Sequence, residues 1–306
     1  MTTTKIPAPS PLPINIKPQS QHNDDETQPA SKETVPKPKL RLRLEDARHS
    51  AAAPFFGLIP DLEAVLDSAL TAIVEQLYTS PRGRTHNSNN ESDASKAPIP
   101  SFTPFIPPTR SVTIILQDFN GVAYTNGTDL DDDHKEIHFS LSYINHVCNN
   151  DAQPLAELKG VLTHELVHCY QHTAPKHDDA EGEIPRPPGG LIEGIADFVR
   201  LKAGLGAAHW QKPKSALDRA SGWDAGYQHT AYFLSWLEDV RFGKGAIGLL
   251  NDRLLRTGYL GEAEEEENEK DKKEPGFWRG LFGVEVDDLW EQYGRYLDKE
   301  VQGKEE

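Results

Sequence analysis

Cysteine is scarce in this sequence, and acidic side chains outnumber basic ones. Only two cysteines, Cys148 and Cys169, occur among the 306 residues, so no disulfide framework stabilises the fold, and we expect both thiols to be free. The 32 lysines and arginines stand against 48 aspartates and glutamates, which gives a formal net charge of −16. Binding to nucleic acid or to an anionic membrane needs a basic surface, so the charge argues against both partners.

Long apolar runs are absent as well. No run approaches the roughly 18 residues that a membrane-spanning helix needs. The first residues, MTTTKIPAPSPLPINIKPQ, lack the apolar core of a secretory signal peptide. The sequence therefore predicts a cytoplasmic or otherwise intracellular protein with no membrane anchor.

Composition divides the chain into a leader, one domain and a short tail. Residues 1–37 carry few large apolar side chains and cannot bury enough surface to offset their conformational entropy. We expect a disordered leader there, a single domain over residues 38–300 and a tail over residues 301–306. Two polar stretches inside the domain, about 80–108 and 262–275, are expected to be disordered loops.

Apolar periodicity predicts strands first and helices afterwards. Alternating apolar and polar residues predict strands at 39–44, 111–116, 121–124 and 136–141, with a polar turn over 126–134. Helical spacing of apolar residues predicts helices at 61–78, 154–174, 190–204, 224–240, 244–256 and 285–299. The expected fold class is α+β, with an N-terminal mixed-sheet region followed by a mostly helical half.

The helix predicted at 154–174 carries an HExxH motif. Residues four apart lie on one face of a helix, so the imidazoles of His164 and His168 can reach one metal ion. Glu165 then lies beside the metal-bound water, whose pKa zinc lowers to about 7, and can accept its proton. The motif predicts one zinc ion per chain. An apolar stripe buries the opposite face of this helix and consists of Leu155, Leu158, Leu162, Leu166 and Cys169.

Catalytic zinc takes three protein ligands and leaves one position open. We expect the third ligand to come from a second pair of charged residues. The segment 190–199 is apolar around most of its circumference, yet Glu193 and Asp197 lie four residues apart on one face. Burying an unpaired carboxylate is costly, so both need partners. We assign Glu193 to zinc and Asp197 to a ligand imidazole N–H, with ion pairs to Arg200 or Lys202 as the alternative.

Other residues compete for the third ligand position. Asp197 takes this position if its helix is rotated, and it is the second choice after Glu193. His172 continues the four-residue spacing after His168, but one straight helix cannot direct three successive turns at one tetrahedral ion. His177 lies in a polar stretch and is expected to be solvated.

The chain also contains the stretches GVAYTNG, EIHFSLSYI, GVLTHELVHCYQH, GGLIEGIADFVRLKAG and GWDAGYQHTAYFLSWLE. These stretches resemble the basic secretory protein family, the peptidases of plants and bacteria, over most of residues 110–240. The resemblance implies a zincin-like fold, in which an edge strand binds a peptide or protein substrate above the HExxH helix. It also implies a gluzincin-type pattern, HExxH followed by E-x-x-x-D, which falls on His164, Glu165, His168, Glu193 and Asp197. The acidic charge and the missing secretion signal depart from the family name.

The matching region contains further candidates for the peptidase reaction. Zinc peptidases need a donor for the oxyanion that forms when water attacks a carbonyl. Tyr227 is the first choice and His229 the second, and each is alternatively a packed core residue. An extended peptide can pair with a strand edge, for which the 137–141 strand and the 121–124 segment are both candidates.

The preferred interpretation is a zinc-dependent peptidase that hydrolyses peptide bonds through a metal-activated water. A catalytically idle binding or regulatory protein with the same fold is the alternative, which the intact Glu165 disfavours. A structural zinc site needs a fourth protein ligand, which neither Cys148 nor Cys169 supplies. A hydrolase of non-peptide substrates would use the same water chemistry, and the oligomeric state stays open.

Overall fold

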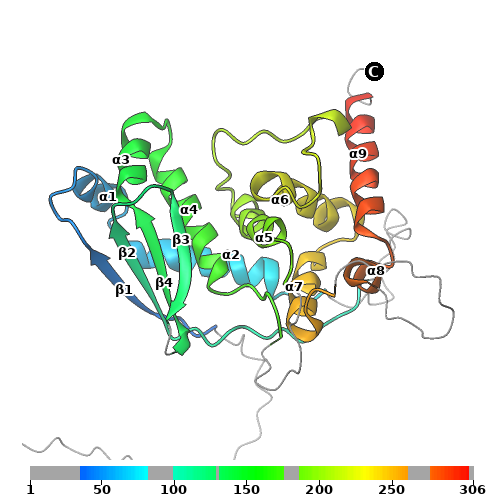
Figure 1. Cartoon of the computed structure of the whole chain (residues 1–306), viewed down its shortest axis with the longest axis horizontal. Helices are drawn as coiled ribbons and strands as arrows, with labels where there is room; N and C mark the ends of the chain where they lie inside the picture. The colour runs from blue at the N-terminus through cyan, green and yellow to red at the C-terminus, as the bar shows by residue number, and fades with distance from the viewer. Residues whose placement is uncertain (1–34, 82–98, 129–130, 176–185, 261–275, 303–306) are drawn as a thin grey trace, which may run out of the picture. The chain divides into compact units, whose positions relative to one another are not determined.

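Alternating and β-branched residues build one mixed sheet of four strands. The strands are β1 (Lys39–Leu44), β2 (Ser111–Gln117), β3 (Ala123–Thr128) and β4 (Asp131–Ser140). Their order across the sheet is β1-β2-β4-β3. The pairs β1–β2 and β2–β4 are parallel, whereas β3 pairs antiparallel with β4 and forms an edge of the sheet (Figure 1).

The computed structural model describes residues 35–81, 99–128, 131–175, 186–260 and 276–302. A compact unit begins at Lys37, and every helix and strand of the described residues lies in it. Nearly all of the predicted leader, residues 303–306 of the predicted tail and most of the two predicted loops lie outside the described residues, whereas residues 301–302 of the tail belong to a helix that ends at Gln302. Those four expectations therefore stay predictions.

Two of the described helices lie between β1 and β2 in the chain, and the others follow β4. They are α1 (Ala52–Leu58), α2 (Leu62–Leu77), α3 (Leu141–Asn150), α4 (Pro154–His168), α5 (Gly189–Lys202), α6 (Tyr227–Trp236), α7 (Ala246–Thr257), α8 (Phe277–Phe282) and α9 (Val286–Gln302). A 3-10 helix, η2 (Ala216–Asp218), precedes α6, and a π-helical turn, η3 (Leu237–Arg241), extends it. Within the described residues, no helix combines the length and apolar character needed to cross a membrane. The fold class is α+β, as the sequence predicts.

One face of the sheet contributes its apolar side chains to the core. Ile114 of β2 pairs with Ile137 of β4, and Leu116 pairs with Phe139, which places all four on the same face. All four side chains are fully buried. The ring of Phe139 meets Phe55 of α1 edge-on, with 6.4 Å between centroids. This packing fixes the sheet against α1, which lies between β1 and β2 in the chain.

Helix α4 lies between the sheet and the helical half. It packs against β3 on one side and against α5 on another, and α5 in turn packs against α6 (Figure 1). Two glycines allow α5 and α6 to approach closely. A Cβ atom on Gly190 would lie 1.7 Å from the carbonyl oxygen of Asp224, and one on Gly194 would lie 2.2 Å from Cγ2 of Thr230. The first turn of α6 is therefore held directly against α5.

An aromatic cluster holds α6 from its other side. The ring of Phe233 on α6 meets Trp290 of α9 edge-on at 5.3 Å and lies 6.3 Å from Trp278 of α8. The ring centroids of Trp236 and of Tyr293 on α9 are 5.4 Å apart. Large buried aromatic rings contribute strongly to core stability. The position of α6 is thus determined by packing on two sides, independently of the polar groups at its start.

The hairpin formed by β3 and β4 corrects the predicted turn over residues 126–134. That prediction is wrong, because β3 continues to Thr128 and β4 already begins at Asp131. Asn126 and Glu136 lie opposite each other in this antiparallel pair. Backbone hydrogen bonds hold such a pair whatever its side chains, so a polar strand at a sheet edge is easily mistaken for a loop.

Several helix boundaries also differ from the predicted ones. Helices α1, α3 and α8 have no predicted counterpart; α3 begins directly after β4, where the side chain of Ser140 accepts a hydrogen bond from the backbone N–H of Tyr143. The helix predicted at 154–174 is too long, since α4 ends at His168. Leu155, at the start of α4, is 38% exposed and does not belong to the buried stripe.

Candidate metal centre

The last turn of α4 brings two imidazoles together. His164 and His168 lie one turn apart, and their ring centroids are 4.8 Å from each other. Their Nε2 atoms face each other at 3.1 Å. His164 is buried and His168 is half-buried, so neither imidazole lies in open solvent.

Glu193 of α5 completes a triangle with these two imidazoles. Its Oε2 atom lies 3.1 Å from Nε2 of His164 and 3.7 Å from Nε2 of His168. These three residues form a group that could hold a metal ion. Burial favours the neutral acid, but hydrogen bonds from both imidazoles outweigh it and lower the pKa of Glu193. Lone pairs and a negative charge converge here, so a cation, either a proton or a metal ion, must lie among them.

Asp197 lies one turn further along α5 and fixes the orientation of His164. The Nδ1–H of His164 donates to Oδ1 of Asp197 over 2.7 Å, and Asp197 is only 3% exposed. Burial lowers the pKa of His164, but the hydrogen bonds to Asp197 and Glu193 raise it to about 9. With Nδ1 occupied by a carboxylate, Nε2 is the ring atom that faces the triangle.

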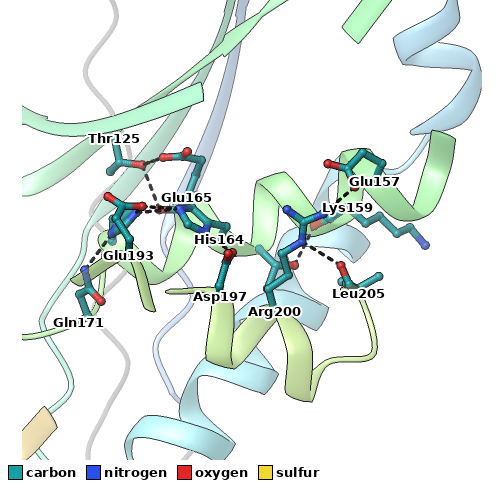
Figure 2. Close-up of polar contacts among 12 residues, drawn as sticks. Thr125, Glu157, Lys159, His164, Glu165, Gln171, Glu193, Asp197, Arg200 and Leu205 are labelled. Carbon is teal, nitrogen blue, oxygen red and sulfur yellow. Dashed lines mark hydrogen bonds and ion pairs between the residues drawn. The ribbon is translucent and has the colours of Figure 1, made fainter. Parts of the chain in front are cut away.

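Glu165 points from α4 toward the sheet edge, where Thr125 of β3 holds it. The hydroxyl of Thr125 lies 2.7 Å from Oε2 of Glu165 and 3.0 Å from the backbone carbonyl oxygen of the same residue (Figure 2). Glu165 is 5% exposed. Its carboxylate is thus oriented by a neutral donor, and no lysine or arginine among the described residues forms an ion pair with it.

Tyr227 and His229 lie at the start of α6 and line the same cleft as the triangle. The cleft has a volume of about 820 Å³. The ring of Tyr227 stacks on His164 with 6.2 Å between centroids and an interplanar angle of 14°. Tyr227 is 57% exposed and has a φ of 46°, a left-handed conformation rare outside glycine. Such strain at about 1–3 kcal/mol is retained mainly where function or packing requires it.

The remaining sequence-based candidates lie elsewhere. His172 is turned away from the triangle, with its Nε2 atom 2.9 Å from the carbonyl oxygen of Phe105. Asp197 contacts His164 and not the centre of the triangle, and Arg200 pairs with neither Asp197 nor Glu193. His177 lies outside the described residues. Cys169 is a free thiol that is buried against α4, and Cys148 is also free.

Two residues beside the triangle are not among the sequence-based candidates. Thr125 belongs to a strand that pairs with the sheet and meets α4 only after folding. Gln171 places its side-chain amide nitrogen 2.8 Å from Nδ1 of His168. Gln171 lies in the turn after α4, which ends at His168, so the contact depends on how the chain turns there. No sequence signal points to Thr125.

Taken together, the fold and the site define an α+β protein with a potential metal cluster on an HExxH helix beside a sheet edge. The family model described as peptidase of plants and bacteria matches residues 37–293. The chain belongs to this family. Its members are named as peptidases, which indicates a hydrolase. No curated protein and no solved structure matches the chain.

Proposed function

We propose that this chain is a zinc-dependent peptidase whose single zinc ion is held by His164, His168 and Glu193. The supporting observation is the triangle itself, with sides of 3.1, 3.1 and 3.7 Å between its ligand atoms. Tetrahedral zinc with bonds of about 2.0–2.1 Å separates neighbouring ligand atoms by about 3.3 Å. Two imidazoles and one carboxylate are also the ligand set of zinc sites that hydrolyse peptides.

The proposed chemistry is hydrolysis of a peptide bond by an activated water. A zinc ion held by His164, His168 and Glu193 would supply Lewis acidity, enough to lower the pKa of a bound water to about 7 and to polarise the scissile carbonyl. Glu165 takes the proton from the attacking water and later delivers it to the leaving amine. Thr125 keeps the Glu165 carboxylate in one orientation by donating a hydrogen bond from its hydroxyl to Oε2. Tyr227, which stacks on His164, is our first choice as donor to the oxyanion, and His229 is the second.

The edge strand β3 is the proposed support for the substrate. Residues 122–125 line the cleft, and among the described strands β3 has a neighbour, β4, on one side only. An extended peptide could therefore add to the free edge through main-chain hydrogen bonds. The other sequence-based candidate, the 137–141 strand, is ruled out as an edge, because its residues 137–140 belong to β4, which is paired on both sides, and Leu141 begins α3.

This arrangement is the one that a zincin-like fold of the gluzincin type would give, with Asp197 behind the first histidine. We accordingly propose a peptide or protein as the partner. The net charge of −16 supports no role for nucleic acid or a membrane surface as partner. An intracellular location remains the expectation from the sequence.

The first test is metal content together with cleavage by the Glu165→Gln variant. The purified protein, supplied with zinc, should hold one zinc ion per chain by elemental analysis and should cleave a mixed peptide library. Glu165→Gln should keep the zinc and lose about 100- to 10,000-fold in kcat, the usual contribution of a general base. Glu75→Gln is the matched control, since Glu75 is an exposed glutamate on α2 that pairs with Lys244.

Each outcome separates the interpretations. Zinc with no cleavage by either form would favour the idle binding or regulatory protein. Equal cleavage by the wild type and Glu165→Gln would remove Glu165 from the mechanism. A chain that takes up no zinc when the metal is supplied would overturn the ligand assignment.

A further inference from the structure

Gln171 lies just beyond α4, where the chain folds back toward the last ligand of that helix. The backbone N–H groups of Tyr170 and Gln171 both donate to the carbonyl oxygen of Val167, over 2.8 and 2.7 Å. This tight turn ends the helix at His168. The side-chain amide of Gln171 then reaches Nδ1 of His168 at 2.8 Å.

The residues on either side of Gln171 are anchored in the core. The backbone carbonyl of Tyr170 accepts a hydrogen bond from the hydroxyl of Tyr78, the residue that directly follows α2. The backbone N–H of His172 donates to Oδ1 of Asn251 on α7 over 2.9 Å. Because both neighbours are fixed by other helices, the amide of Gln171 is held against His168 by the fold and not by chance contact.

Metal binding through Nε2 determines which ring nitrogen of His168 carries the proton. A neutral imidazole that presents its Nε2 lone pair to a cation keeps its proton on Nδ1, and that proton needs an acceptor. For His164 the acceptor is Asp197. For His168 the group within reach is the amide of Gln171, whose Oε1 atom is buried and has no hydrogen-bond partner among the described residues. A half-turn of the amide exchanges its oxygen and nitrogen and brings Oε1 onto Nδ1.

We propose that Gln171 is a positioning residue of the metal site: its side-chain carbonyl accepts the Nδ1 proton of His168 and so directs the Nε2 lone pair at the ion. This inference rests on the proposed metal at His164, His168 and Glu193. The two imidazole ligands then have different supports, a charged carboxylate from α5 and a neutral amide from the turn after α4. Gln171 contacts the ligand and not the substrate.

The expected consequence is a loss of metal affinity on removal of the acceptor. Gln171→Leu keeps the approximate size of the side chain and has no acceptor, so its zinc affinity should fall about 10- to 100-fold. Gln171→Glu keeps an acceptor and should bind zinc at least as tightly as the wild type. Gln228→Leu is the matched control, because Gln228 lines the same cleft and accepts a hydrogen bond from the backbone of Gln211, away from both imidazoles.

The experiment is a competition titration of zinc between the full chain and a chromophoric chelator. Denaturant unfolding in excess chelator shows that each variant is folded. Cobalt substitution gives a second readout, since its visible absorption bands report ligand geometry. In Gln171→Leu these bands should shift, and in Gln228→Leu they should match the wild type.

The outcomes distinguish this inference from the proposed function. If the wild type and folded Gln171→Leu bind zinc equally, Gln171 has no positioning role, and the zinc site stands. A weaker affinity of Gln171→Glu would also overturn the inference, even if the leucine variant fails to fold. If the wild type itself binds no zinc, the proposed function fails first.

Discussion

Helices α4 and α5 contribute charged residues to two polar clusters. The clusters differ in whether a lysine or arginine of the protein balances their carboxylates. The ligand cluster consists of His164, His168, Glu193 and Asp197. The Arg200 cluster consists of Glu157 of α4, Arg200 of α5 and Tyr143 of α3. Glu157 and Arg200 lie further from the sheet-edge contact of Glu165 along α4 and α5 (Figure 2). Both place charged groups in largely buried positions, where each charge must be compensated.

The Arg200 cluster is compensated entirely by the protein. One guanidinium nitrogen donates to Oε2 of Glu157 over 2.7 Å, and Nε donates to the carbonyl oxygen of Leu205 over 2.8 Å. Tyr143 donates to the other carboxylate oxygen of Glu157 over 2.8 Å. A Cβ atom on Gly160 would lie 2.5 Å from Nε of Arg200, so the glycine makes room for the guanidinium. Positive and negative charges cancel, and no further ion is needed.

The ligand cluster contains no such balance. Glu193 and Asp197 bring two carboxylates to two imidazoles, and neither carboxylate is paired with a lysine or an arginine among the described residues. A divalent cation would neutralise both. The comparison teaches that burial of charge alone does not single out a possible metal site; ligand atoms that converge without a lysine or arginine among the described residues form a group that could hold a metal ion.

Removal of Arg200 should give the largest change in stability. Arg200→Met leaves Glu157 buried without its cation, since both side chains are only 7% exposed, and breaking such a pair costs about 3–5 kcal/mol. Urea unfolding of the metal-free protein measures this loss. The folded variant should still bind one zinc ion with an affinity near that of the wild type.

A double variant separates the ion pair from general damage. Glu157→Gln combined with Arg200→Met should be less destabilised than the sum of the two single changes, by about 0.5–3 kcal/mol. Additive losses would mean that the pair itself contributes nothing. A zinc affinity that falls with Arg200→Met would show that the two clusters are coupled and would break the comparison.

Replacement of Asp197 should have the next largest effect, and it should fall on the metal. Asp197→Asn removes the charged acceptor of the His164 Nδ1 proton, which is expected to weaken zinc binding about 10- to 100-fold, or about 1.4–2.7 kcal/mol. The same competition titration measures it. Asp239→Asn is the control, because this carboxylate pairs with Lys202 and half of its side chain is exposed. Equal affinities in both variants would leave Asp197 without a role in orienting the ligand.

The ligand cluster was more accessible to sequence analysis than its surroundings. His164 and His168 are linked by helical spacing, and Glu193 and Asp197 stand out as carboxylates in an apolar helix, so local patterns suffice to predict them. Thr125 depends instead on which strand forms the sheet edge, and the sequence leaves two candidates open, the 121–124 segment and the 137–141 strand. Such partners are set by tertiary packing and leave no local pattern.

The Arg200 cluster shows the same division within the helical half. Helical spacing predicts that Arg200 shares a face with Glu193 and Asp197, and ion pairs within α5 were therefore an alternative to metal binding. The structure pairs Arg200 with Glu157 of α4, a choice that depends on how the two helices dock. The contact of Gln171 with His168 likewise depends on tertiary structure, because it forms in the turn that ends α4, where the sequence predicts a continuing helix.

Disruption of an exposed ion pair should have the smallest effect and tests whether burial, and not distance, sets the energy. Lys244 lies 2.8 Å from Glu75, nearly the same separation as in the Arg200–Glu157 pair, but more than half of each side chain is exposed. Water and salt screen such a pair, so Lys244→Gln should lower the unfolding free energy by less than about 1 kcal/mol. Urea unfolding at low and high salt measures it beside Arg200→Met. A loss as large as that of Arg200→Met would show that burial is not what makes the Arg200 cluster strong, because the two pairs differ chiefly in exposure.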